Sequence, residues 1–134
     1  DFLYDKPSVL IGRKGTIDKP KYQDAPFWTV DTLFFSEIFE NCDPKFIFYK
    51  FCMVDWLKNN EASGVPSQTA KRIESLKIAL PQSKPEQTAI AQTLSDMDSE
   101  IAALEARAAK LAHIKQGLMQ NLLTGKIRVN AGAA

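Results

Sequence analysis

The last third of the chain carries hydrophobic residues at alternating intervals of four and three positions. They occupy the a and d positions of a heptad repeat, where only Lys115 is polar. The hydrophobic members are Ile90, Leu94, Met97, Ile101, Leu104, Ala108, Leu111, Leu118 and Leu122. This spacing predicts one long coiled-coil helix. Such a helix would be about 60 Å long at ~1.5 Å per residue, so we expect it to bury this seam against a partner helix.

Signals for helix ends support that prediction. Ser83 followed by Glu86 matches a capping box, and Thr124-Gly125 is typical of a C-terminal stop. No such long repeat occurs earlier in the chain, where short patterns predict three strands and two helices. We expect strands at 8–11, 27–36 and 76–80, a loop at 59–66, and helices at 45–58, behind Asp43 and Pro44, and at 69–75.

The composition changes sharply between these two parts. All 8 Phe, both Trp and all 3 Tyr lie before residue 83, and none lies after it. We therefore expect a small domain over residues 1–82 and the helical region over residues 83–134, an α+β organisation with a mixed domain followed by one long helix. The chain starts at Asp1 rather than Met, so we expect it to be part of a longer protein or a processed form.

Charge and reactive side chains exclude several classes of function. The net charge of +1 gives no global field that would attract nucleic acid, and no apolar run reaches the ~20 residues that a membrane span needs. Cys42 and Cys52 lie in an aromatic-rich stretch without a CxxC motif, which favours two buried free thiols. His113 is the only histidine, so neither a metal site nor a catalytic Ser/His/Asp set is expected. These features argue against an enzyme.

Two short polar segments are candidates for contact with nucleic acid. The first follows the 8–11 strand, and its cations and glycine turn suit phosphate binding. Its candidate residues are Arg13, Lys14, Thr16, Lys19 and Lys21. The second is a polar loop that leads into a helical turn, with Ser67, Gln68, Thr69 and Lys71 as candidates. The alternatives are a solvated hairpin turn for the first segment and a capped turn for the second.

The long helix has an asymmetric distribution of charge. Its first half holds the acids Glu86, Asp96, Asp98, Glu100 and Glu105, whereas its second half holds Arg107, Lys110, Lys115 and the following Lys126. The helix dipole favours this order. Antiparallel pairing of two such helices favours it as well, because acids then lie beside bases.

Four stretches resemble one protein family. Leu80-Pro81 followed by 85–91 (PEQTAIA) is similar to the junction that ends a recognition domain in specificity subunits of type I restriction-modification systems. Residues 115–128 (KQGLMQNLLTGKIR) resemble the end of that family's conserved helix. Residues 9–15 (VLIGRKG) resemble its strand–turn motif, and 64–66 (GVP) the loop before its last strand.

The resemblance implies a non-catalytic subunit that reads DNA. In that family two recognition domains each bind one half of a bipartite target, and their helices pack antiparallel as a spacer. Methyltransferase and restriction subunits dock on this scaffold and use S-adenosylmethionine, ATP and Mg, whereas no cofactor is expected on this chain. The complex is expected in the cytoplasm, without a membrane.

This chain has one domain and one helix, so we expect the C-terminal half or a half-length form of such a subunit, with a domain incomplete at its N-terminus and an antiparallel homodimer. Two alternatives remain open. One is a coiled-coil protein-interaction module, and the other is the recognition end of a fused restriction-methylation enzyme.

Overall fold

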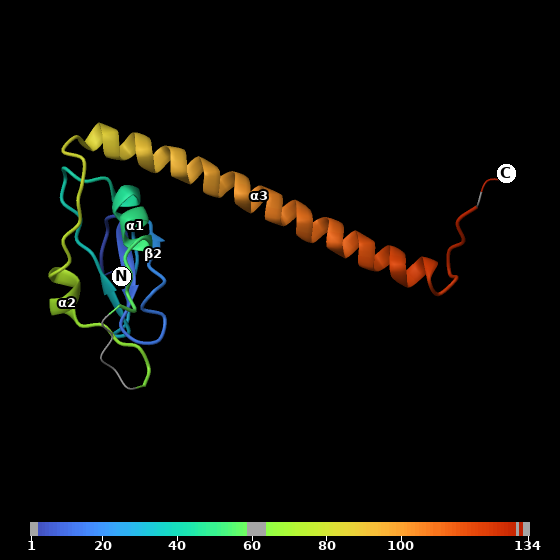
Figure 1. Ribbon diagram of the computed structural model, residues 1–134, viewed down its shortest axis with the longest axis horizontal. Helices are drawn as coiled ribbons and strands as arrows, with labels where there is room; N and C mark the ends of the chain where they lie inside the picture. The colour runs from blue at the N-terminus through green and yellow to red at the C-terminus, as the bar shows by residue number, and fades with distance from the viewer. Residues whose placement is uncertain (1–2, 59–63, 131, 133–134) are drawn as a thin grey trace. The chain divides into compact units, whose positions relative to one another are not determined.

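A computed structural model of the protein describes residues 3–58, 64–130 and 132. The chain divides into two compact units, Asp1–Thr93 and Leu94–Ala134. Figure 1 shows the elements, which are β1 (Ser8–Gly12), β2 (Lys21–Gln23), β3 (Leu33–Phe35), α1 (Pro44–Cys52), α2 (Ala70–Glu74) and α3 (Lys84–Leu122). A small sheet with helices confirms the α+β class. The expected domain boundary between residues 82 and 83 stays a prediction.

A three-stranded antiparallel sheet forms the centre of the first unit, with β1 between β2 and β3. Leu10 of β1 lies opposite Lys21 on one side and opposite Phe35 on the other. Every residue of β1 is buried. The predicted strand at 8–11 is thus confirmed, and its run of apolar residues reflects a central position in the sheet.

Hydrophobic side chains pack on both faces of this sheet. Val9 and Ile11 join Ile17, Phe51 and Trp56 in the main core, on the face that α1 covers (Figure 1). Successive side chains of a strand point to opposite faces, so Leu10 points away from this core. The aromatic rings of Tyr4, Phe27 and Phe35 pack together, with ring centroids 5.2–6.0 Å apart.

Two strand predictions need correction. The predicted strand at 27–36 is reduced to β3, because the pairing with β1 stops where Gly12 faces Leu33. The segment 76–80 alternates as a strand should, but it pairs with neither edge of the sheet. Leu76 and Ile78 instead pack against the main core from outside the sheet. The prediction also missed β2, which is only three residues long.

Helix α1 begins as predicted but ends early. Asp43 caps its N-terminus by accepting a hydrogen bond from the Phe46 amide at 2.9 Å. The helix ends at Cys52 rather than near residue 58, because the indole of Trp56 folds back and donates to the Phe51 carbonyl at 2.9 Å. Neither cysteine forms a disulfide, as predicted, but Cys52 is exposed and Cys42 is half-buried, so the prediction of two buried thiols is wrong. Of the predicted 59–66 loop, residues 59–63 lie outside the described part.

Helix α2 confirms the prediction of one or two helical turns at 69–75. Thr69 is its N-cap and accepts from the Arg72 amide. Helix α3 likewise confirms the predicted long helix, and Gly125 follows its end with a φ of +72°, a conformation that glycine adopts without steric cost. The predicted helix stop is therefore correct.

The first turn of α3 is attached to the domain by a glutamine. Gln87 is 2 % exposed, and its amide oxygen accepts from the Asp43 amide at 2.9 Å. Its amide nitrogen donates to the Pro81 carbonyl at 2.8 Å. The Thr88 hydroxyl adds a hydrogen bond to the Asp43 carboxylate at 3.0 Å. One side chain thus joins the starts of α1 and α3 and the segment between them.

Candidate nucleic-acid interface

The structure brings the two candidate segments into direct contact. Lys14 and Ser67 form an isolated antiparallel bridge. On either side of it, the Gly15 amide donates to the Pro66 carbonyl and the Gln68 amide donates to the Arg13 carbonyl, both at 2.9 Å. Residues more than fifty positions apart in the sequence therefore share one surface. We call the surface formed by residues 13–16 and 66–71 the turn surface.

Arg13 is held in place on this surface by three contacts. Its amide donates to the Thr32 carbonyl at 2.9 Å. Its guanidinium donates to the Asp31 carbonyl at 3.4 Å and lies 5.8 Å from the ring centroid of Phe34. A shallow pocket lies between Arg13, Lys14, Asp31 and Thr32. The guanidinium is thus oriented by the protein while the residue remains exposed, which suits a contact with an anionic ligand.

Gly12 allows the turn to close. A Cβ atom at this position would lie 2.7 Å from the carbonyl oxygen of Thr16, closer than side chains tolerate. The close approach of the two backbone segments therefore requires glycine at the end of β1. At Gly15 the backbone has a φ of +77°, which again favours glycine.

The candidates of the second segment have different environments. Gln68 is 3 % exposed, and its amide nitrogen donates to the Trp56 carbonyl at 2.9 Å. Its side chain therefore stabilises the interior of the domain. Thr69 uses its hydroxyl to cap α2. Ser67 is half-buried, and Lys71 is exposed on α2. As folded, Gln68 cannot reach a ligand, so it belongs to the support of the surface.

The remaining candidates of the first segment are all exposed. Thr16 and Lys19 are connected through the backbone, because the Lys19 amide donates to the Thr16 carbonyl at 3.3 Å. Lys21 opens β2. Next to it, burial raises the pKa of Tyr22, and the charges of Asp24 and Asp43 raise it further, so this phenol is neutral at pH 7.

Sequence reasoning missed the loop that supports the turn surface. The sequence predicts a strand at residues 27–32, but apart from the bridge of Phe27 with Tyr4 they form a loop, whose Thr32 and Asp31 carbonyls hold Arg13. This loop presents Trp28 with 65 % of its surface exposed. The two prolines at 20 and 26 were a signal of irregular structure, but they do not reveal which backbone groups face the turn.

Other kinds of site are absent from the part of the chain that the structure describes. Over residues 3–58 and 64–130, no group of three or more His, Cys, Asp or Glu side chains could hold a metal ion. No described helix is long and apolar enough to cross a membrane. The polar side chains gathered at the turn surface are mainly cations and hydroxyls, with the carboxylate of Asp31 next to Arg13.

The structure thus combines a small mixed domain, which presents a cationic turn, with one long helix. The family model of the type I restriction modification DNA specificity domain matches residues 1–116, and the chain belongs to this family. The family consists of domains that provide DNA sequence recognition. No curated protein and no solved structure matches the chain.

Proposed function

We propose that this chain reads one half of a bipartite double-stranded DNA target through the turn surface. The observation that carries this proposal is the Lys14–Ser67 bridge, which joins two polar segments into one exposed surface. Arg13, Lys14 and Lys71 contribute cations for phosphates, and Ser67 contributes a hydroxyl. Lys19 and Lys21 extend the positive charge beside it.

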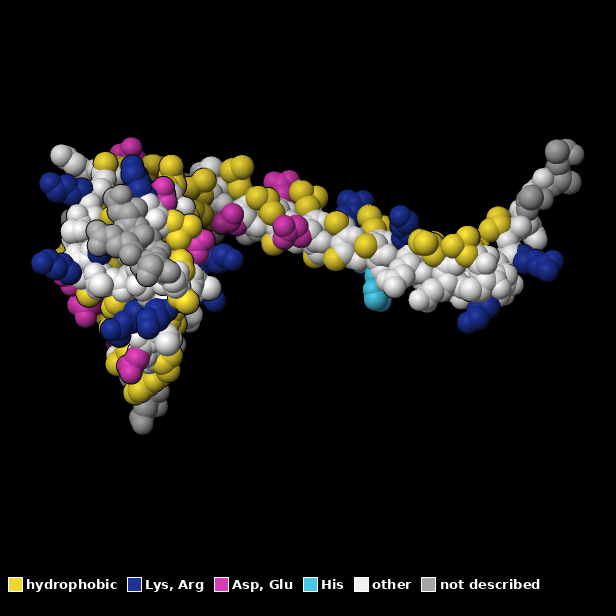
Figure 2. All heavy atoms as spheres, turned by 60° about the horizontal axis from the view of Figure 1, so that its bottom comes forward, with side chains coloured by type: hydrophobic (Ala, Val, Ile, Leu, Met, Phe, Trp, Pro, Cys, Tyr) yellow, Lys and Arg dark blue, Asp and Glu magenta, His cyan; other side chains and the backbone are white. Residues whose placement is uncertain are grey.

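We also propose that α3 pairs with α3 of a second copy in antiparallel orientation. Its seam residues are exposed in the single chain, with 57 % of the Met97 and Leu104 side chains accessible. Figure 2 shows hydrophobic side chains along the helix, acidic side chains on its first half and basic side chains on its second half. Antiparallel pairing buries the hydrophobic side chains and places unlike charges side by side.

Such a homodimer rebuilds a subunit with two readers. Because the two domains are related by a two-fold axis, they recognise identical half-sites in opposite orientation, and the target is an interrupted palindrome. The paired helices serve as the spacer and as a scaffold for methyltransferase subunits. Catalysis then resides on those partners, which use S-adenosylmethionine, and on restriction subunits, which use ATP and Mg.

A charge-removal experiment tests the DNA-binding surface. Arg13 and Lys14 are both replaced by Ala, and the affinity for a random-sequence DNA duplex is measured at several salt concentrations. The control replaces Lys77 and Lys110, two exposed lysines outside the turn surface, so that both variants lose the same charge. We expect the Arg13/Lys14 variant to bind more weakly, with a salt slope about 1 lower per lost phosphate contact.

The test compares how much DNA affinity the two variants lose. If both lose the same affinity, binding depends on net charge and not on the turn surface, and the proposal fails. If neither loses affinity, the domain does not contact DNA through this turn. A protein-binding role for the domain would then be the better explanation.

A further inference from the structure

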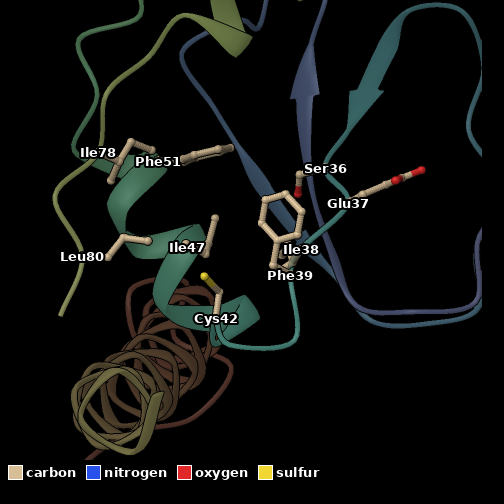
Figure 3. A pocket seen from close by; sticks show the side chains of 9 residues that line it. All are labelled: Ser36, Glu37, Ile38, Phe39, Cys42, Ile47, Phe51, Ile78 and Leu80. Atoms are coloured by element: carbon tan, nitrogen blue, oxygen red, sulfur yellow. The ribbon is translucent and has the colours of Figure 1, made fainter. Parts of the chain in front are cut away.

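An exposed phenylalanine marks an apolar groove on the domain. Phe39 follows β3 and has 80 % of its surface exposed. Figure 3 shows it at the edge of a pocket of about 200 Å³, whose lining includes Ile47 of α1 and Leu80, with the thiol of Cys42 on its border. A second pocket shares Ile38, Phe39 and Cys42 with the first and extends to Lys84 at the start of α3. We call the two pockets together the Phe39 groove.

The seam of α3 is already covered at its first turn by the chain's own domain. Counting back one heptad from Leu94, Gln87 occupies an a position, and it is buried against α1 and Pro81. Ala91 beside it is also buried. From Ile90 onward the seam is exposed. A partner helix can therefore follow the seam only as far as Ile90.

This limit fixes the register of an antiparallel pair. The seam runs from Ile90 to Leu122, and its midpoint is Ala106. When residues equally distant from Ala106 face each other, every a position meets a d position. The facing pairs are Leu94 with Leu118, Ile101 with Leu111, Ala108 with Leu104, Lys115 with Met97 and Leu122 with Ile90. All the seam residues are then buried.

Neighbouring registers are worse for physical reasons. A shift by one heptad in one direction leaves Ile90 without a helical partner. A shift in the other direction pushes the last turns of the second helix over Gln87, where the domain already packs. In the central register, Gly125 of the second copy faces Gln87. The helix thus ends where the partner's domain begins.

The segment after the helix then reaches the Phe39 groove. At this register, α3 of one copy ends beside the start of α3 of the other, where Lys84 lines the groove, and residues 126–129 leave the helix there. This segment carries two exposed apolar side chains, Ile127 and Val129, the latter with 74 % of its surface exposed. By the same count Lys126 faces Glu86, so these two unlike charges meet.

We propose that residues 126–129 of a second copy dock in the Phe39 groove, so that each chain closes the domain of its partner. This inference rests on the antiparallel homodimer proposed above and adds to it a defined register and a second contact. The apolar side chains at 127 and 129 cover the exposed ring of Phe39. The dimer is thereby held at both ends as well as along the seam.

Disulfide trapping tests the docking directly, because Cys42 borders the groove. Val129 is replaced by Cys in a chain that also carries Cys52→Ser, and the protein is oxidised and analysed without reduction. The control replaces Leu123, an exposed residue just after α3 and outside the seam. We expect a covalent dimer between Cys42 and position 129, formed at least about tenfold faster than in the control, because docked cysteines react at high effective concentration.

A second variant separates this inference from the dimer itself. Cysteines at positions 90 and 122, which face each other in the proposed register, are introduced without Cys42 and Cys52. If this pair links the two chains but Cys42 and position 129 do not, the groove proposal is overturned and the dimer stands. A monomer in light scattering overturns both. A link between Cys42 and position 129 within one chain also overturns the docking.

Discussion

Replacing Gln87 by Ala should destabilise the domain, because this side chain joins the start of α3 to it. The substitution leaves the Asp43 amide and the Pro81 carbonyl without the partner that bonds them at 2.9 and 2.8 Å, both good hydrogen-bond distances. An unpaired buried group costs about 1–3 kcal/mol, so the loss for the two groups is about 2–6 kcal/mol. Small domains are stabilised by only ~5–15 kcal/mol in total, so the effect should be easy to measure.

Urea unfolding followed by tryptophan fluorescence provides the assay. Trp56 is buried in the main core and reports on unfolding of the domain. The control is Gln116→Ala, which makes the same change at an exposed position of α3 and should alter stability by less than ~0.5 kcal/mol. Protein concentration is kept equal, because self-association contributes to apparent stability. If the two variants unfold at the same urea concentration, Gln87 does not stabilise the junction and the reasoning is refuted.

Two further substitutions test the turn and the seam. Gly12→Ala should lower the unfolding free energy by about 1–3 kcal/mol, because its Cβ would lie 2.7 Å from the Thr16 carbonyl oxygen. Gly64→Ala, whose Cβ meets nothing within 4 Å, should leave urea unfolding unchanged, and equal losses in both would contradict this explanation. Leu111→Asp should abolish self-association by placing a charge in the seam, at a cost of several kcal/mol. Ala109→Asp, on the other side of the helix, should preserve the oligomer in light scattering, and a Leu111 variant that still associates would refute the seam.

Elements whose signals are local could be predicted from the sequence. The heptad repeat predicts α3 because a helix forms from hydrogen bonds between residues four positions apart, and Gly125 ends it for an equally local reason. The caps at Asp43 and Thr69 are local in the same way. These elements could be predicted from their own residues, whatever the rest of the chain does.

Which segments of the chain meet could not be predicted from any one segment and depends on the folded structure. The alternating stretch at 76–80 carries a strand signal, yet no edge of the sheet pairs with it, whereas the short β2 pairs with β1. A strand forms only when a second segment pairs with it, so neither the alternation at 76–80 nor the short β2 segment is enough to predict pairing. The same applies to the contact between Lys14 and Ser67, which the sequence presents as two unrelated motifs.

Buried polar side chains show most clearly the difference between what local sequence predicts and what depends on the folded structure. Gln68 and Gln87 have the same side chain as the exposed Gln116, so nothing in the sequence predicts that they are buried. Both are buried because backbone groups of distant segments need hydrogen-bond partners. Gln68 bonds the Trp56 carbonyl, and Gln87 bonds the Asp43 amide and the Pro81 carbonyl. Local periodicity thus predicts α3 and its seam. The hydrogen bonds that Gln87 and Gln68 make to backbone groups attach the start of α3 to the domain and support the turn surface.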